Sequence, residues 1–397
     1  MYFNSIITII ICKRFNKELY FLKIIVAPDS FKGSLTAIQA AQAMAAGIHD
    51  YDPEIRTVLL PAADGGEGTM SSLIGATDGK LITVDVQDPL GRIIEASYGV
   101  LGDKETCVIE IAEASGLMLL AENELNPLVA SSVGTGELIL HALNSGYRKF
   151  IIGLGGSATN DGGAGMLQAL GMKFMGKEGK VLSPGGGFLS ELEKIDTTFF
   201  DKRIAESKFI IACDVENPFV GPNGASFVFG PQKGATLEMV ERLDANLSKF
   251  ANLVEQLTGH SLHHQEGAGA AGGAGGAFQA FFPAETKQGI DVVLEAISFE
   301  AHLKDTDIIF TGEGKSDVQT LSGKTPFGIA TAAHRAGKPT ILISGAIDED
   351  SRALLSPMFT ELYAIADGTV STEESIKKAF QYLRLKTKKA IGQYLEI

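Results

Sequence analysis

The sequence predicts an α/β fold divided into two domains. Short runs of β-branched residues are followed by loops rich in Gly, Asp and Ser and then by a helical pattern, and this unit recurs along the chain. The runs are almost continuously apolar, which is typical of strands buried on both faces of a parallel sheet. With 397 residues, the chain also exceeds the length at which a single hydrophobic core usually stops growing, so two domains are expected.

The first of these units has the clearest helix start. Its apolar run and loop are followed by Thr36 and Gln39, whose spacing predicts a capping box. Ligands gather at the carboxyl ends of parallel strands, so the loops after the runs are the candidate sites. The runs cover residues 24–27, 57–60, 150–152, 209–212, 308–311 and 340–344.

Other segments depart from this repeating unit. Between residues 81 and 111, turn signals separate strand-like segments without a helix, which predicts an antiparallel meander and a domain of different topology. Apolar residues at steps of three and four predict an amphipathic helix over residues 237–257. The Gly- and Ala-rich residues 268–277 predict a tight turn and a closely packed helix start. Ser371 with Glu374 caps a last predicted helix that runs to about Gln393.

Residues 1–22 are expected to be an extension outside the fold. The apolar run at residues 6–11 is shorter than the roughly 20 residues that span a bilayer, and it lacks the charged region that precedes a signal peptide core. Our hypothesis is that translation starts at Leu22, because a strand pattern follows at once. The intact mass of the native protein tests this, and a mass that includes residues 1–21 would contradict it.

Composition limits the class of partner. The net charge of −14 leaves no basic surplus for a nucleic-acid backbone. The cysteines Cys12, Cys107 and Cys213 are widely spaced and odd in number, so they form neither a disulfide framework nor a zinc site. We therefore expect a soluble, cytoplasmic protein with a small-molecule ligand and with neither a nucleic acid nor a membrane as partner.

The glycine-rich loop at residues 153–165 is the main candidate for anion binding. It follows a strand, opens a helix and begins with the GxGxxA form of the dinucleotide fingerprint, and amides at such a helix start bind phosphate. A purely structural glycine turn is the alternative. No Walker A loop is present, because the Gly that should precede Gly314-Lys315-Ser316 and Gly323-Lys324-Thr325 is replaced by Ile309 and Val318.

Carboxylates lie at the ends of predicted strands, and cations lie near the same loops. Phosphoryl transfer needs carboxylates to hold Mg²⁺ and orient the acceptor hydroxyl, and cations to neutralise phosphate. Taken singly, each such carboxylate could equally cap a loop, and each lysine could be an ordinary surface residue. The carboxylates are Asp29, Asp64, Asp214, Glu313 and Asp317, and the cations are Lys32, Arg92, Lys233, Lys315 and Lys324.

Several segments, in order from Lys23 to about Gly345, together resemble the type I glycerate kinase family. They include Pro28-Asp-Ser-Phe-Lys-Gly33, Asp64-Gly-Gly-Glu-Gly68, the loop at residues 153–165 and Gly230-Pro-Gln-Lys-Gly234. Lys315 departs from the pattern, since the family usually has Arg there. The remaining segments are residues 88–92, 134–137, 213–218, 267–273, 311–314, 319–320 and 323–324.

The resemblance implies ATP- and Mg²⁺-dependent phosphorylation of glycerate, usually giving 2-phosphoglycerate and less often 3-phosphoglycerate. It also implies a discontinuous flavodoxin-like (Rossmann-like) parallel-sheet domain, residues 23–65 plus 286–397, and an inserted mixed α/β domain, residues 66–285, with the active site between them. A homodimer is a further expectation. The alternatives are an NAD-dependent hydroxy-acid dehydrogenase, suggested by the GxGxxA match, and a non-catalytic metabolite sensor.

Site roles are expected on the same basis. Catalytic residues are Lys32, Asp214, Glu313 and Lys324, of which Asp214 and Glu313 would hold Mg²⁺ or the acceptor hydroxyl. The residues expected to bind the nucleotide are Gly155, Gly156, Ser157, Asn160, Asp161, Gly163, Gly269 and Gly272. The residues expected to bind glycerate are Asp29, Ser30, Asp64, Arg92 and Lys233, with Arg92 and Lys233 facing its carboxylate.

Overall fold

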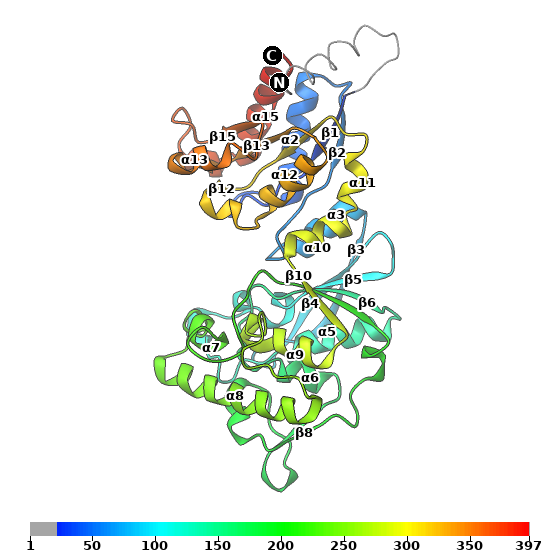
Figure 1. The fold of residues 1–397 in the computed structure, drawn as a ribbon, viewed down its shortest axis with the longest axis vertical. Coiled ribbons are helices and arrows are strands. Elements are labelled where there is room, and N and C mark those ends of the chain that lie inside the picture. Colours follow the sequence, from blue (N-terminus) through cyan, green and yellow to red (C-terminus); the bar gives the residue numbers. More distant parts are fainter. Residues whose placement is uncertain (1–21, 397) are drawn as a thin grey trace. The chain divides into compact units, whose positions relative to one another are not determined.

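The computed structural model describes residues 22–396, drawn as a ribbon in Figure 1. The proposed extension and translation start concern residues 1–21, which lie outside the described residues. The described chain forms two compact units. The first unit holds the residues up to Asp64 and those from Leu294 onward, and the second is the continuous segment Gly65–Val293. The second boundary falls within helix α10 (Gly289–Ala296), later than the sequence placed it.

The first unit is built on a five-stranded sheet in the order β15-β13-β11-β1-β2, and all its strand pairs are parallel. The chain runs from β1 to β2 on one side and then to β11, β13 and β15 on the other. The strand order therefore reverses between β1 and β11, and ligands collect beside such a switch point. The strands are β1 (Lys23–Val26), β2 (Arg56–Leu59), β11 (Ile308–Thr311), β13 (Thr340–Ser344) and β15 (Glu361–Ala364).

Helices cover this sheet, and its central strands form the core of the unit. Ile24, Phe310 and Ile341 are fully buried and pack with side chains of α2 and α15. Parallel strands alternating with helices confirm the predicted α/β class. The helices are α2 (Ala37–Tyr51), α11 (Phe299–Leu303), α12 (Thr325–Arg335), α13 (Glu349–Leu355), α14 (Thr372–Lys377) and α15 (Ala379–Glu396), and a small pair of strands is formed by β12 (Lys315–Ser316) and β14 (Ala346–Ile347).

Two helices of this unit test how well the sequence predicted where helices begin and end. The capping box of α2 is confirmed, because the Gln39 amide donates to Thr36 Oγ1 and the Thr36 amide donates to the Gln39 side chain. The prediction of one continuous last helix was wrong. Ser371 does cap a helix, but Lys378 leaves helical geometry at φ −121° and ψ 35°, which separates α14 from α15.

The second unit contains a six-stranded sheet in the order β10-β9-β6-β5-β4-β3. The predicted meander is confirmed, since β3 pairs with β4 and β4 with β5 in antiparallel fashion. The sheet then continues in parallel from β5 through β6, β9 and β10. The strands are β3 (Lys80–Gln87), β4 (Ile93–Val100), β5 (Thr106–Glu110), β6 (Lys149–Gly153), β9 (Lys208–Ala212) and β10 (Ala284–Lys287).

The core of this second sheet is aromatic. Phe150 on β6 stacks on Phe209 on β9 with ring centroids 4.6 Å apart, and Phe278 and Phe282 pack against Phe209. The amphipathic helix predicted from residue 237 is confirmed as α8, which buries the middle of its apolar stripe and leaves Leu237 and Leu257 at its ends exposed. The other helices are α3 (Thr69–Thr77), α4 (Ala112–Ser115), α5 (Val133–Asn144), α6 (Ala164–Ala169), α7 (Ala225–Phe229) and α9 (Ala274–Phe281); α8 covers Leu237–Thr258, and β7 (Lys173–Met175) and β8 (Lys194–Asp196) form a separate pair.

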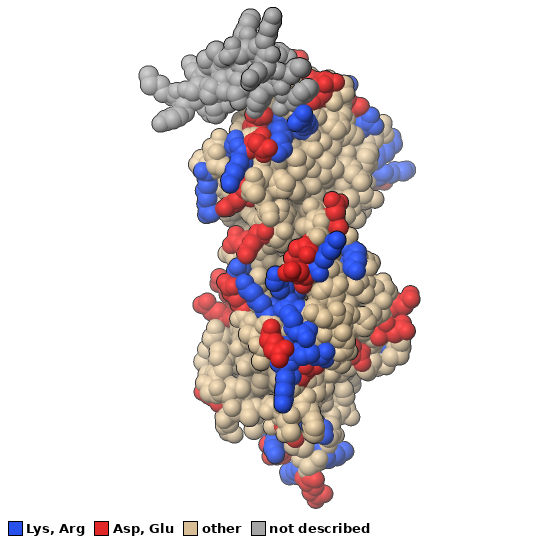
Figure 2. All heavy atoms as spheres, turned by 90° about the vertical axis from the view of Figure 1, so that its right-hand side faces the viewer, with Lys and Arg blue, Asp and Glu red and all other residues tan. Residues whose placement is uncertain are grey.

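Three general properties of the described residues bear on function. None of their helices is long and apolar enough to cross a membrane. On the face drawn in Figure 2, Lys and Arg side chains gather in places, with Asp and Glu side chains beside them. Of the described cysteines, Cys107 is buried and Cys213 half-buried, and burial raises the pKa of the Cys107 thiol to about 12, so this thiol is unreactive at neutral pH.

Candidate active site

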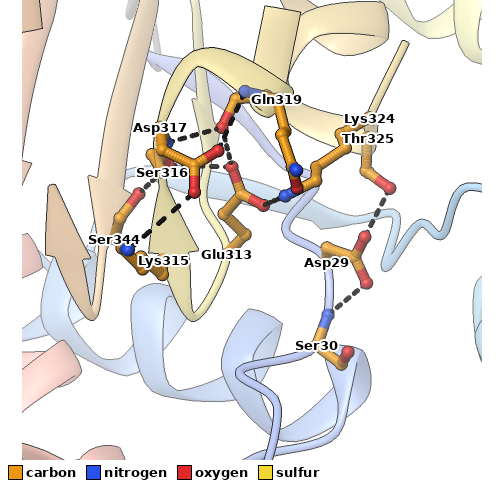
Figure 3. A network of polar contacts seen from close by, with 11 residues as sticks. Asp29, Ser30, Glu313, Lys315, Ser316, Asp317, Gln319, Lys324, Thr325 and Ser344 are labelled. Atoms are coloured by element: carbon orange, nitrogen blue, oxygen red, sulfur yellow. Dashed lines mark hydrogen bonds and ion pairs between the residues drawn. The ribbon is translucent and has the colours of Figure 1, made fainter. Parts of the chain in front are cut away.

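The loops after β1 and β11 form one polar cluster in the first unit, shown in Figure 3. These two strands are neighbours, and their pairing continues past their ends, because the Asp29 amide donates to the Gly312 carbonyl at 2.8 Å. This pairing fixes Asp29 beside the loop that carries Glu313. The cluster therefore lies at the carboxyl edge of the sheet, next to the point where the strand order reverses.

Glu313 is the centre of this cluster. One carboxylate oxygen, Oε1, accepts hydrogen bonds from Ser316 Oγ at 2.8 Å and Thr320 Oγ1 at 2.7 Å, and the other, Oε2, lies 3.7 Å from the Lys324 ammonium (Figure 3). Burial raises the pKa of the carboxyl, while the two hydroxyls and Lys324 oppose the rise. Glu313 is thus a buried carboxylate with one oxygen fixed by hydroxyls and the other facing a cation.

Asp29 lies on the other side of the start of α12. Its Oδ2 accepts a hydrogen bond from Thr325 Oγ1 at 2.6 Å, and its Oδ1 accepts from the Ser30 amide (Figure 3). Burial raises the pKa of Asp29 to about 6, and the nearby charges of Asp64 and Glu313 add to the rise. A carboxylate that titrates near neutrality is suited to accepting a proton from a substrate hydroxyl.

The cations of this unit are placed differently from one another. Lys324 comes directly before the first residue of α12 and is partly buried against Glu313. Lys32 is exposed in the loop after β1, where its amide lies near Gly314. Lys315 is largely exposed and lies 4.0 Å from Asp317, at the limit of an ion pair. Lys324 is therefore the cation built into the cluster.

In the second unit, the glycine-rich loop presents only part of itself to solvent. Gly155 and Gly156 are exposed, and neither amide has a hydrogen-bond partner among the described residues. Gly156 has φ 72°, a backbone conformation that favours glycine. We name these two residues the exposed turn.

The remainder of the loop faces inward. Asp161 is fully buried, and its carboxylate accepts hydrogen bonds from Ser132 Oγ at 2.8 Å, the Ser132 amide at 2.9 Å and the Gly163 amide at 3.1 Å. The buried Asn160 donates to Ser226 Oγ at 2.9 Å. These contacts show Asp161, Asn160 and Gly163 acting within the protein, whereas the sequence assigned them to the nucleotide.

Gly269 and Gly272 are also packed against protein backbone. A Cβ atom on Gly272 would lie 1.9 Å from the Thr159 carbonyl oxygen, and one on Gly269 would lie 2.2 Å from the Pro218 carbonyl oxygen. Both glycines are buried in the turn before α9, which confirms the tight turn predicted for residues 268–277. Their smallness is needed for two segments of chain to touch.

Lys233, expected to bind the glycerate carboxylate, points into the interior of the second unit. Its side chain is 2% exposed, and its ammonium donates to Ser157 Oγ at 2.9 Å and to the Thr159 carbonyl at 2.7 Å. Burial lowers the pKa of this lysine to about 7, while the charge of Asp161 opposes the fall. Lys233 thus contacts the glycine-rich loop through both of these hydrogen bonds.

Arg92 is expected to bind the same carboxylate, and it already has two anionic partners. Its guanidinium lies 2.5 Å from Asp88 Oδ2 and 2.7 Å from Glu124 Oε1. The side chain is half-exposed, and a guanidinium has five N–H donors, so both pairs leave donors that a substrate carboxylate could use. Asp214 is exposed after β9, and its Oδ1 accepts a hydrogen bond from the Gly289 amide at 2.9 Å.

The structure shows contacts of two residues, Glu110 and Thr325, for which the sequence indicated no role. Glu110, at the end of β5, is buried and accepts a hydrogen bond from the Met70 amide at 2.7 Å. It holds the start of α3, which follows the Asp64-Gly-Gly-Glu-Gly68 segment, and burial raises its pKa. A glutamate that ends an apolar strand run was the signal available. In the sequence, Thr325 stood out only as the last residue of an incomplete Walker A pattern. In the structure, its hydroxyl joins the start of α12 to Asp29.

The carboxylates expected to bind metal do not form a ready-made metal cage. Among the described residues, no group of three or more His, Cys, Asp and Glu side chains is placed to hold an ion. Asp214 belongs to the second unit and Glu313 to the first. Mg²⁺ commonly binds through one or two carboxylates, with substrate phosphates and water completing its shell, and the oxygens of Glu313 suit that mode.

A carboxylate, a hydroxyl and a lysine beside the switch point of a parallel sheet are typical of α/β enzymes that act on small anionic substrates. The model of the glycerate kinase family matches residues 24–395. The chain belongs to the glycerate kinase family.

Individual relatives are similar to this chain over almost its whole length. Glycerate kinase from Bacillus subtilis is 48% identical over 362 residues, covering 91% of this chain and 95% of that protein. Glycerate 2-kinase from Escherichia coli is 44% identical, covering 90% of this chain and 94% of that protein. A crystal structure assigned as glycerate kinase 2 from Salmonella typhimurium LT2 is 41% identical, with a TM-score of 0.84 and coverage of 94% and 98%. These relatives do not support the dehydrogenase alternative.

Proposed function

We propose that this protein transfers the γ-phosphoryl group of ATP to the 2-hydroxyl of glycerate, giving 2-phosphoglycerate. The observation that carries this proposal is the match over nine-tenths of the chain to a relative named glycerate 2-kinase. Phosphorylation of the 3-hydroxyl is the second regiochemistry to test. We also propose a flavodoxin-like topology for the first unit, based on its strand order, and a cytoplasmic location.

The cluster in the first unit supports roles in phosphoryl transfer. We propose that Asp29 hydrogen-bonds the acceptor hydroxyl and takes its proton, since this carboxylate titrates near neutrality and is oriented by Thr325. Lys324 and Lys32 would neutralise charge on the transferring group. We also propose that Ser30 and Asp64 contact the substrate beside Asp29.

Mg²⁺ fits the donors that the chain offers. Glu313 Oε2 is a hard oxygen on a buried carboxylate, and Glu313 Oε1 is held by two hydroxyls, so the side chain presents Oε2 in one fixed direction. When bound, the ion would neutralise charge on the phosphates of ATP. Asp214 is the second proposed ligand on the basis of its exposure after β9.

For the nucleotide phosphates we propose the exposed turn, Gly155 and Gly156. Its amides have no partner among the described residues, and backbone amides in glycine turns bind phosphate. Arg92 stays a proposed carboxylate ligand, since its half-exposed guanidinium keeps N–H donors beside its pairs with Asp88 and Glu124.

One assay tests the function. The protein is incubated with glycerate, MgATP and NAD, and ADP and NADH are followed separately. We expect ADP that depends on glycerate, and a phosphorus NMR spectrum of 2-phosphoglycerate. Formation of 3-phosphoglycerate would overturn the regiochemistry, and NADH without ADP would overturn the kinase assignment.

A further inference from the structure

A buried lysine contacts the residues that follow the exposed turn of the second unit. Lys233 ends a short 3-10 helix, Pro231–Lys233, and its whole side chain is buried. The ammonium reaches across to a loop that is distant in sequence and donates to Ser157 Oγ at 2.9 Å and to the Thr159 carbonyl at 2.7 Å. These two acceptors lie one and three residues after Gly156.

Burying this charge is costly, so its retention needs a reason. A lone ammonium in a protein interior loses its hydration, and burial lowers the pKa of Lys233 to about 7. A methionine would fill the same space without that cost. The feature that methionine would lose is the pair of hydrogen bonds to the loop.

The loop depends on outside partners for its shape. On one side of the exposed turn, the Leu117 amide donates to the Gly156 carbonyl at 2.8 Å and the Ala158 amide donates to the Ser115 carbonyl at 2.9 Å. On the other side, the contacts nearest the turn come from Lys233, and those of Asn160 and Asp161 lie further along the loop. Thr159 Oγ1 and Asn160 Oδ1 are buried without a hydrogen-bond partner, so these two atoms do not anchor the loop.

We propose that Lys233 is a positioning residue that holds the exposed turn, Gly155 and Gly156, in the shape that binds the phosphates of ATP, through its contacts with Ser157 and Thr159. This inference rests on the proposed function, in which the turn binds those phosphates. Lys233 itself does not contact the ligand. Its effect is therefore on nucleotide binding, with the chemical step and the binding of glycerate left intact.

Lys233→Met tests this inference. We expect the KM for ATP and the Kd for ATP from calorimetry to rise about tenfold, the usual scale for losing a hydrogen bond to a charged group. The kcat and the KM for glycerate should stay within about threefold of the wild type, because these terms do not depend on the turn. Lys180→Met, at an exposed lysine of the same unit, is the matched control and should leave all the constants unchanged.

A merely structural role would give a different pattern. In that case Lys233→Met would lower the unfolding midpoint and the amount of active enzyme, with an unchanged KM for ATP, and the inference would be overturned. An equal fall in kcat/KM for both substrates would also contradict it. If the wild type binds ATP but does not phosphorylate glycerate, the proposed function fails while the calorimetric comparison still decides the role of Lys233.

Ser157→Ala keeps the test decisive if Lys233→Met does not fold. It removes one acceptor and leaves the lysine in place, so a smaller rise in the KM for ATP, about threefold, is expected. Where both variants fold, their double mutant separates two readings. The effects should be strongly non-additive if Lys233 acts through Ser157, and additive effects would show that Ser157 contacts the phosphate by itself.

Discussion

Asp29 is the residue for which the structure makes the sharpest kinetic prediction. Its pKa lies near 6, above the usual value for Asp, so it loses its proton at a higher pH than an exposed Asp. If it accepts the hydroxyl proton, kcat should fall about tenfold per pH unit below pH 6. Asp29→Asn should lower kcat by about 10²–10⁴-fold and remove this acid limb.

The control for Asp29 is Asp305→Asn, at an exposed carboxylate of the same unit that pairs with Lys23 at 2.7 Å. It should keep the wild-type pH profile. Wild-type enzyme with constant kcat down to pH 5 would contradict a catalytic proton transfer at Asp29.

The two carboxylate oxygens of Glu313 should have different functions, and two variants can distinguish them. Glu313→Gln keeps an oxygen that accepts from Ser316 and Thr320, so stability should change little, while loss of the charge should raise the Mg²⁺ concentration for half-maximal rate by at least about tenfold. Glu313→Ala leaves the hydroxyls without that acceptor and should cost about 2 kcal/mol in the free energy of unfolding. Urea unfolding and Mg²⁺ titration measure the two effects. Equal loss of stability in both variants would show that charge, not hydrogen bonding, holds the cluster.

The sequence indicated which residues are candidates for the site, but it did not show the direction in which their side chains point. Strand-end position marked Asp29 as a site candidate, and the segment Gly230–Gly234 marked Lys233. Asp29 joins a polar cluster at a sheet edge, whereas Lys233 turns into the interior. The difference comes from tertiary packing, because Lys233 meets a loop more than 70 residues away in the chain. Glu110 was missed for the same reason, since its partner amides lie on another element.

At the scale of elements, glycines in the second unit serve packing as much as ligand approach. Gly272 has φ 66° and a Cβ there would lie 1.9 Å from the Thr159 carbonyl oxygen, whereas Gly146 has φ 95° with open space around its Cβ position. Gly272→Ala should therefore cost about 3 kcal/mol or more in unfolding free energy, and Gly146→Ala about 1 kcal/mol from backbone strain alone.

Urea unfolding of the two alanine variants compares them directly. The two positions share a left-handed backbone, so the difference between them isolates the packing term. Similar small losses at both positions would mean that the Gly272 and Thr159 segments can separate without cost, which would contradict the tight contact.

Elements were predicted well where the signal was local. Strand runs, the α2 capping box and the stripe of α8 all depend on residues within one or two turns of chain. The break at Lys378 was missed because the sequence on both sides is compatible with a helix, and neither Gly nor Pro marks it. The glycine-rich loop was recognised, but the sequence did not show which of its residues face solvent.

At the scale of the whole molecule, the two units differ in how their chains are connected. The second unit is one continuous segment with its own sheet and core, whereas the central strand β1 of the first unit pairs with β11, which lies more than 280 residues further along. That pairing could not be read from local patterns, and only the order of recognised segments suggested it.

This connectivity predicts which pieces fold alone. A protein of residues 65–296, which keeps α10 whole, should unfold cooperatively in urea, because its sheet and aromatic core are complete within the segment. Residues 294–396 alone should not, since they lack β1 and β2 and leave one side of β11 without its partner strand. Circular dichroism and urea titration of the two pieces measure this. A non-cooperative 65–296 segment would contradict the expectation that it is a domain. ATP binding by this piece would support phosphate binding by the exposed turn, which it contains.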